Sequence, residues 1–259
     1  MGFEFIVYEI SEKVATLYLN RPNSLNTLNE GMKEEIKEAF CIAAEGKNIR
    51  ALVLTGKGRF FCAGADLYRF KKDYEHFERT GESSRFYDIT LPRIFAFFPK
   101  PLIAAVNGPA VGVGMTMMLA CDIRLASESA SFSCPFTRIG LTPEFGSSYH
   151  LPRLVGYARA AEWILTGRTI KAQEALSTGL INRLVAPEAL LDEARNIAQI
   201  IATMPEKAVG AAKRLLCQAL DSSLDEALER ETKVFQDCQK DRTHYLAVCK
   251  LLEQMKAKK

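Results

Sequence analysis

The chain has 259 residues, and 48% of them are apolar, which is enough for a deep hydrophobic core. Its 34 basic and 31 acidic side chains leave a formal net charge of only +3. This near balance provides neither the basic surface that nucleic acids require nor a polybasic segment for a membrane surface. We therefore expect the partner to be a small molecule or another protein.

The cysteines and the two ends of the chain bear on its compartment. The seven cysteines are odd in number and include no C-x-x-C pair, which favours reduced thiols in a reducing compartment. Residues 1–9 alternate like a strand and lack the basic leader and apolar core of a secretory signal. The final M-K-A-K-K does not match the peroxisomal S-K-L signal. We expect a cytoplasmic protein if the source is bacterial.

The first part of the chain predicts a hairpin followed by a helix. Residues 3–9 and 13–19 alternate in polarity and are rich in β-branched side chains, which is typical of two paired strands. The following segment, residues 30–45, has apolar side chains at helical spacing. Asn29 or Thr27 is placed to cap this helix.

The next part predicts a buried strand and two helical segments. Residues 51–56 form a short apolar run, which is typical of a parallel strand buried on both faces. Strand, helix and strand in this order indicate a right-handed crossover unit. Residues 68–84 are dense in charge and predict a solvated helix or a mobile flap. Residues 88–98 predict a helix with these inward side chains: Ile89, Leu91, Ile94, Phe95 and Phe98.

A glycine-rich loop follows and carries the main functional signal. An apolar strand over 102–106 enters the loop N-G-P-A-V-G-V-G, and an apolar helical segment over 115–121 leaves it. The N–H groups around Val113 and Gly114, at the start of that helix, suit an oxygen that becomes negative during a reaction. Further short strands are expected at 122–126 and 131–134.

This region has two other interpretations. A dinucleotide site requires G-x-G-x-x-G, but Met117 stands where the third small residue belongs after Gly112 and Gly114. That interpretation fails. The lone carboxylate Glu144, which follows Pro143, could be a first-turn acid that the helix dipole favours. On these residues alone, a structural and a catalytic role for Glu144 both stay open.

The remainder of the chain is predicted to be mainly helical, over residues 156–166, 171–178, 187–204, 206–220 and 224–255. A helical tail behind a βαβ core commonly covers a site or joins subunits. We place the core at residues 1–200 and the helical region at 201–259, within one functional unit.

Other reactive side chains predict no second site. The three histidines, at positions 76, 150 and 244, are scattered without a carboxylate or cysteine at ligand spacing, so no metal is expected. Cys62 has apolar neighbours and no identifiable base, which favours an inert buried thiol. Asp66 fits the N-cap of the following helix better than a catalytic base.

Four ordered blocks of the sequence together point to a family: R-P-N-S-L-N-T-L, R-F-F-C-A-G-A-D-L, K-P-L-I-A-A-V-N-G-P-A-V-G-V-G and T-G-R-T-I-K-A-Q-E-A-L-S-T-G-L-I-N-R-L-V. The chain resembles the crotonase (enoyl-CoA hydratase/isomerase) superfamily. This resemblance implies an α/β fold with a ClpP-like ββα-spiral core and a C-terminal helical trimerisation region. It also implies acyl-CoA thioester substrates, homotrimers or dimers of trimers, and no metal or separate cofactor, since coenzyme A is part of the substrate.

The same resemblance implies a set of site residues. The amides of Ala65 and Val113 correspond to the oxyanion hole. The two glutamates of the hydratases correspond to Thr116 and Phe136, whereas Glu144 falls where peroxisomal-type Δ3,Δ2-enoyl-CoA isomerases keep a single base. Substrate contacts are expected at Ser24, Leu25, Ala63, Gly64, Ala65, Asp66, Leu67, Gly112, Val113, Thr116 and Phe136.

The implied activity is Δ3,Δ2-enoyl-CoA isomerisation in fatty acid oxidation. One glutamate would move a proton from C2 to C4 of a 3-enoyl thioester, because both carbons lie on one face of the dienolate. The apolar ring of Phe136 would keep water away from that intermediate. Two alternatives stay open: a hydratase or another acyl-CoA enzyme of the superfamily, and a non-catalytic coenzyme A binding module such as the chromodomain-Y-like relatives suggest.

Overall fold

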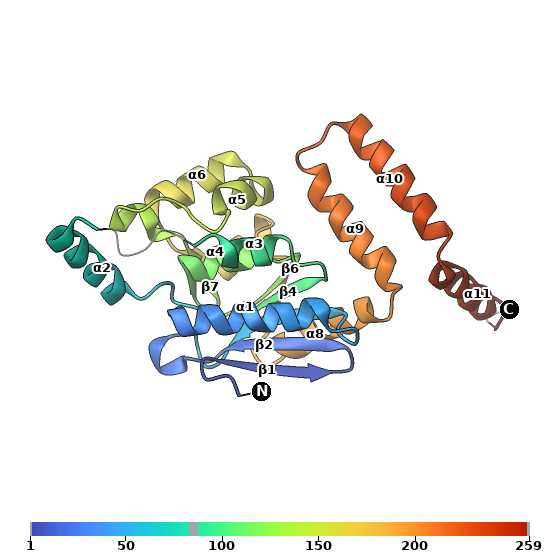
Figure 1. Ribbon diagram of the computed structural model, residues 1–259, viewed down its shortest axis with the longest axis horizontal. Helices are drawn as coiled ribbons and strands as arrows, with labels where there is room; N and C mark the ends of the chain where they lie inside the picture. Colours follow the sequence, from blue (N-terminus) through green and yellow to red (C-terminus); the bar gives the residue numbers. More distant parts are fainter. Residues whose placement is uncertain (1, 83–87, 258–259) are drawn as a thin grey trace.

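A six-stranded sheet lies at the centre of the computed structural model, which describes residues 2–82 and 88–257 (Figure 1). The strand order is β1-β2-β3-β4-β6-β9. Strands β1 and β2 form the predicted antiparallel hairpin, and the later strands are parallel to β2. The bounds are β1 (Ile6–Ser11), β2 (Val14–Leu19), β3 (Ala51–Gly56), β4 (Leu102–Val106), β6 (Ile123–Ser127) and β9 (Arg183–Val185).

Both faces of this sheet are covered, which explains the uninterrupted apolar runs of β3 and β4. Leu52 and Leu54 of β3 point into the larger core cluster beside α1 (Glu30–Glu45). Val53 points to the opposite face, where α8 (Leu190–Ala202) packs. Helix α1 begins as predicted, because the Asn29 side chain accepts a hydrogen bond from the Met32 amide at 2.8 Å.

A smaller three-stranded sheet supports the central loops. It consists of β5 (Ala110–Val111), β7 (Ser131–Ser133) and β8 (Ile170–Lys171), in the order β5-β7-β8. Helix α4 (Val113–Leu119) leaves β5 and is buried along its whole length. This burial explains why its sequence is almost entirely apolar.

The remaining helices surround these sheets. They are α2 (Leu67–Thr80), α3 (Thr90–Ala96), α5 (Ser147–Val155), α6 (Tyr157–Thr166), α7 (Ala172–Ser177), α9 (Glu206–Ala219), α10 (Leu224–Gln239) and α11 (Arg242–Ala257), with 3-10 turns at Pro22–Ser24 and Pro135–Ile139. In Figure 1, α2 lies at one end of the molecule and α9 to α11 extend at the other. Within the part of the chain described, no helix has the length and apolar character needed to cross a bilayer.

Two predicted helix boundaries are wrong for reasons of capping. The segment 224–255 is two helices, because the Asp241 side chain accepts hydrogen bonds from Thr243 and starts α11 anew. The helix predicted over 88–98 begins at Thr90, whose amide donates to Asp88 at 2.8 Å. Ile89 therefore precedes the helix and is 53% exposed, not buried. The charged segment is helical through Thr80, and its predicted end at residues 83–84 lies outside the described residues.

The helical tail is joined to the core through polar contacts. Lys213 of α9 donates to Asp122 at 2.7 Å and to the Lys100 carbonyl at 2.9 Å. Asp221, between α9 and α10, accepts from Tyr149 and Arg153 of α5. The tail also exposes many apolar side chains: Leu216, Leu220, Leu224, Leu228, Phe235, Leu246, Leu251, Leu252 and Met255. The predicted division at residues 200 and 201 falls within α8, and it stays a prediction.

Candidate active site

Two loops from the carboxyl ends of neighbouring strands form the candidate site. The loop after β3 and the loop after β4 are joined directly by backbone hydrogen bonds. The Cys62 amide donates to the Pro109 carbonyl at 3.2 Å, and the Cys62 carbonyl accepts from the Val111 amide at 2.9 Å. A third loop joins them, since Ala63 donates to the Leu25 carbonyl at 3.0 Å. This edge of a parallel sheet is where α/β folds commonly place their ligands.

Gly112 brings these loops into close contact. Its φ of +53° and ψ of −121° lie in a region that side chains with a Cβ strongly disfavour. A Cβ placed there would lie 3.9 Å from the Gly64 Cα and 3.9 Å from Cε1 of Phe136. The residues predicted around the oxyanion hole are therefore neighbours in space.

The amides of Ala65 and Val113 are unused donors on these loops. Over residues 2–82 and 88–257, no oxygen accepts a hydrogen bond from either N–H. Val113 is the first residue of α4, and the first intrahelical bond at this end is donated by Thr116 to the Gly112 carbonyl. Such orphan donors at a helix start suit a developing negative charge on a ligand oxygen.

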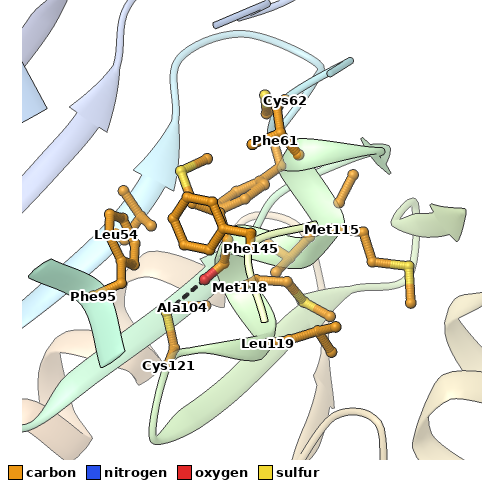
Figure 2. Close-up of a cluster of buried hydrophobic side chains, with 14 of the residues drawn as sticks. Leu54, Phe61, Cys62, Phe95, Ala104, Met115, Met118, Leu119, Cys121 and Phe145 are labelled. Carbon is orange, nitrogen blue, oxygen red and sulfur yellow. Dashed lines mark hydrogen bonds between the residues drawn. The ribbon is translucent and has the colours of Figure 1, made fainter. Parts of the chain in front are cut away.

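The backbone of Glu144 is fixed by the residue that follows it. Phe145 has a left-handed φ of +56°, which costs an aromatic residue free energy of about 1–2 kcal/mol. Its ring is buried and packs edge-on against Phe95 at 5.2 Å between centroids, which offsets that cost. Figure 2 shows Phe145 and Phe95 in the same apolar cluster as Leu54. Because α5 begins only at Ser147, Glu144 is not the first-turn acid that a structural role required.

The side chain of Glu144 contacts the helix that carries Val113. The Thr116 hydroxyl donates to Oε1 of Glu144 at 2.6 Å. Thr116 is fully buried, whereas Glu144 is partly exposed. Thr116 and Val113 lie one turn apart on α4, so the carboxylate and one orphan amide are held by the same short helix.

Two buried thiols also lie near enough to be influenced by the charge of this carboxylate. Burial raises the pKa of Cys62 and of Cys134 to about 12, and the nearby Glu144 charge acts in the same direction. A thiol with such a pKa is almost entirely protonated at neutral pH and is a weak nucleophile. The inert role predicted for Cys62 agrees with this environment.

Alkylation of the native protein tests this assignment. At pH 8, iodoacetamide should modify the exposed Cys41 and leave Cys62, Cys121 and Cys134 unmodified, because about one in 10⁴ molecules of a thiol with a pKa near 12 is ionised. Peptide mass spectrometry gives the rate for each cysteine, and the urea-denatured protein, in which all should react, serves as the control. Labelling of Cys62 as fast as Cys41 would contradict the assignment.

The structure places the other predicted residues as follows. The Asp66 carboxylate accepts from the Tyr68 amide at 3.0 Å and caps α2, as predicted. Leu67, the first residue of α2, is 60% exposed, and Ser24 is exposed at the end of a 3-10 turn. The residues that the fold brings together around Gly112 and Glu144 are Ala63, Gly64, Ala65, Val113, Thr116 and Phe136.

Two asparagines that support the site were not singled out from the sequence. The buried Asn26 donates to the Lys57 and Phe60 carbonyls at 2.9 and 2.8 Å. Asn107 donates to the Gly58 carbonyl at 2.8 Å. Both asparagines brace the loop that leads to Ala65. The only available signal was their position inside the matched blocks, because an amide side chain by itself predicts no partner.

Known proteins resemble this chain along most of its length. A family model described as enoyl-CoA hydratase/isomerase matches residues 9–258. A crotonyl-CoA hydratase of Syntrophomonas wolfei is 35% identical over 99% of this chain and 98% of its own length. The 1,2-epoxyphenylacetyl-CoA isomerase of Escherichia coli is 38% identical over 88% of this chain and 87% of its own. The crystal structure of an enoyl-CoA hydratase from Bacillus anthracis superposes with a TM-score of 0.89 at 33% identity and covers 97% of each chain.

Proposed function

Because the chain belongs to the enoyl-CoA hydratase/isomerase family of the crotonase superfamily, we propose that it is a Δ3,Δ2-enoyl-CoA isomerase. The observation that carries this proposal is the setting of Glu144. Its carboxylate contacts Thr116 beside the orphan amide of Val113, while the positions that correspond to the two hydratase glutamates hold Thr116 and Phe136. The site thus offers one acid/base where hydration would need two.

The first step forms a dienolate. The thioester carbonyl oxygen accepts hydrogen bonds from the Ala65 and Val113 amides, and Glu144 takes a proton from C2 of the 3-enoyl chain. The electrons of the C2–H bond move toward the carbonyl oxygen and form the C1–C2 double bond of the dienolate. Negative charge then collects on that oxygen, where the two amides stabilise it.

The second step returns the same proton. Glu144 delivers it to C4, the electrons of the dienolate reform the carbonyl, and the double bond now lies between C2 and C3. One carboxylate suffices because C2 and C4 lie on the same face of a planar dienolate. The reaction requires no electron acceptor or metal ion, because it only moves one proton from C2 to C4.

Phe136 favours isomerisation over hydration. Its ring is only 6% exposed and stands next to Gly112, at the start of the helix that carries the Val113 amide. Adding water to a 2-enoyl thioester needs one group to activate the water and another to protonate C2. A phenyl ring does neither, and it reduces the space available to water.

A hydratase is the second candidate, since relatives at 35% and 36% identity carry hydratase names. The isomerase name of the Escherichia coli relative, at 38% identity, is in turn in keeping with chemistry other than hydration. The exposed apolar side chains of α9 to α11 support the further proposal that copies of the chain assemble as a trimer or a dimer of trimers.

Parallel assays with 3-enoyl-CoA and 2-enoyl-CoA test the function. We expect steady formation of 2-trans-enoyl-CoA from the former and hydration of the latter that is at least about 100-fold slower, since a missing acid/base group costs that much. Calorimetric binding of acyl-CoA without turnover would instead identify a binding module. Rapid hydration of 2-enoyl-CoA would favour the hydratase.

A further inference from the structure

The hydroxyl of Thr116 has a choice of acceptors and is closer to Glu144. It lies 2.6 Å from Oε1 of Glu144 and 3.4 Å from the carbonyl oxygen of Val113, three residues earlier in the same helix. A helical threonine commonly donates to a carbonyl of the preceding turn. A hydroxyl has one proton to donate, and the shorter contact, to a carboxylate, is the stronger. The usual bond within the helix is therefore given up for the acid.

Thr116 is buried where it contacts Glu144. Its exposed fraction is 0%, and the helix that carries it is buried throughout, so the side chain offers no surface to a substrate. The contact that the resemblance implied between Thr116 and substrate is thus better understood as a contact with the acid. The Glu144 charge also acts on the buried thiols of Cys62 and Cys134 and helps to raise the pKa of each.

One rigid turn of α4 then sets the relation between acid and amide. Val113 begins the helix, and Thr116 follows on the same face. Proton transfer depends steeply on geometry, and a misplacement of about 1 Å costs on the order of 10²-fold in rate. We propose that Thr116 is a positioning residue that holds the Glu144 carboxylate at a fixed place relative to the Val113 amide. This inference rests on the proposed isomerase function, in which both groups act on one substrate.

Replacing the hydroxyl alone tests the proposal. Thr116→Val keeps the shape of the side chain and removes the donor, so kcat for 3-enoyl-CoA should fall about 10- to 100-fold while KM stays within about twofold. Thr116→Ser keeps the donor and should retain kcat to within about threefold. The acidic limb of the kcat/KM profile should move to higher pH in the valine variant only, because the carboxylate loses a donor that favours its charged form.

The outcomes distinguish a failure of this inference from a failure of the proposed isomerase function on which it rests. Wild-type kcat and an unmoved pH profile in Thr116→Val, with Glu144→Gln inactive, overturn the positioning role alone. An active Glu144→Gln enzyme overturns the proposed function. If Thr116→Val does not fold, Thr116→Cys, which has a weak donor of similar size, takes its place, and activity equal to that of Thr116→Ser counts against the proposal.

Discussion

Glu144→Gln should lower kcat for the isomerisation of 3-enoyl-CoA by at least about 10³-fold. The amide has the shape of the acid and its oxygen can still accept from Thr116, but it cannot take a proton from C2. General acid–base catalysis is worth about 10² to 10⁴ in rate, and here one group performs both transfers. KM should change little, because the amides of Ala65 and Val113 are untouched.

Absorbance of the conjugated 2-enoyl thioester measures this loss, and transfer of deuterium from C2 to C4 of a substrate deuterated at C2 follows the proton transfer separately. Both should fall together, since both depend on the same base. Glu188→Gln is the matched control, because Glu188 is exposed and lies in the turn before α8, outside the site. A Glu144→Gln enzyme that keeps a tenth or more of wild-type kcat would exclude Glu144 as the base.

Local pattern could predict the elements that carry a regular apolar pattern or a capping side chain. The apolar runs of β3 and β4 and the Asn29 cap of α1 are confirmed. The superfamily and its α/β fold, predicted from four short blocks, are confirmed by the family match and by the structural likeness. These blocks coincide with loops whose glycines and asparagines are constrained by close backbone contact, which is why they carry so much information.

Other elements have no local signal. Strand β9 has three residues, none of them buried, and exists because it pairs with β6, about sixty residues earlier, as in Leu125 opposite Arg183. Helix α5 starts after Gly146 with no capping side chain and contains Pro152, so both its start signal and its interior argue against a helix. Packing of its Leu151 and Val155 into the core outweighs these local costs.

The candidate site also has residues that the sequence could predict and contacts that it could not. Ala65 and Val113 lie inside the matched blocks, and the fold brings them onto loops in contact, whereas Glu144 was singled out only by the resemblance to the isomerases. The bond between Thr116 and Glu144 spans 28 residues and follows no periodicity. The left-handed backbone of Phe145 could not be predicted from the sequence either, because aromatic residues rarely adopt this conformation and only the surrounding core holds it there.

Gly114→Ala should damage both stability and catalysis, through the contact between the two loops. A Cβ at this position would lie 2.3 Å from the carbonyl oxygen of Cys62 and 2.8 Å from its Cβ. Since the nearest atom belongs to the backbone, no rotamer change relieves the clash, and the loop of Cys62 must move. Overpacking of this kind costs about 1–3 kcal/mol in the free energy of unfolding.

The same movement should separate the two oxyanion donors. The Cys62 carbonyl accepts the Val111 amide at 2.9 Å, so displacing it carries Ala65 away from Val113. Loss of one such donor lowers kcat about 10² to 10³-fold. Gly210→Ala is the matched control, because Gly210 also lies in a helix but its nearest contact would be 3.5 Å, and alanine there should stabilise by about 0.5–1 kcal/mol. Urea unfolding and kcat measured on both variants decide the matter: equal behaviour of Gly114→Ala and Gly210→Ala would show that the loops do not depend on this contact.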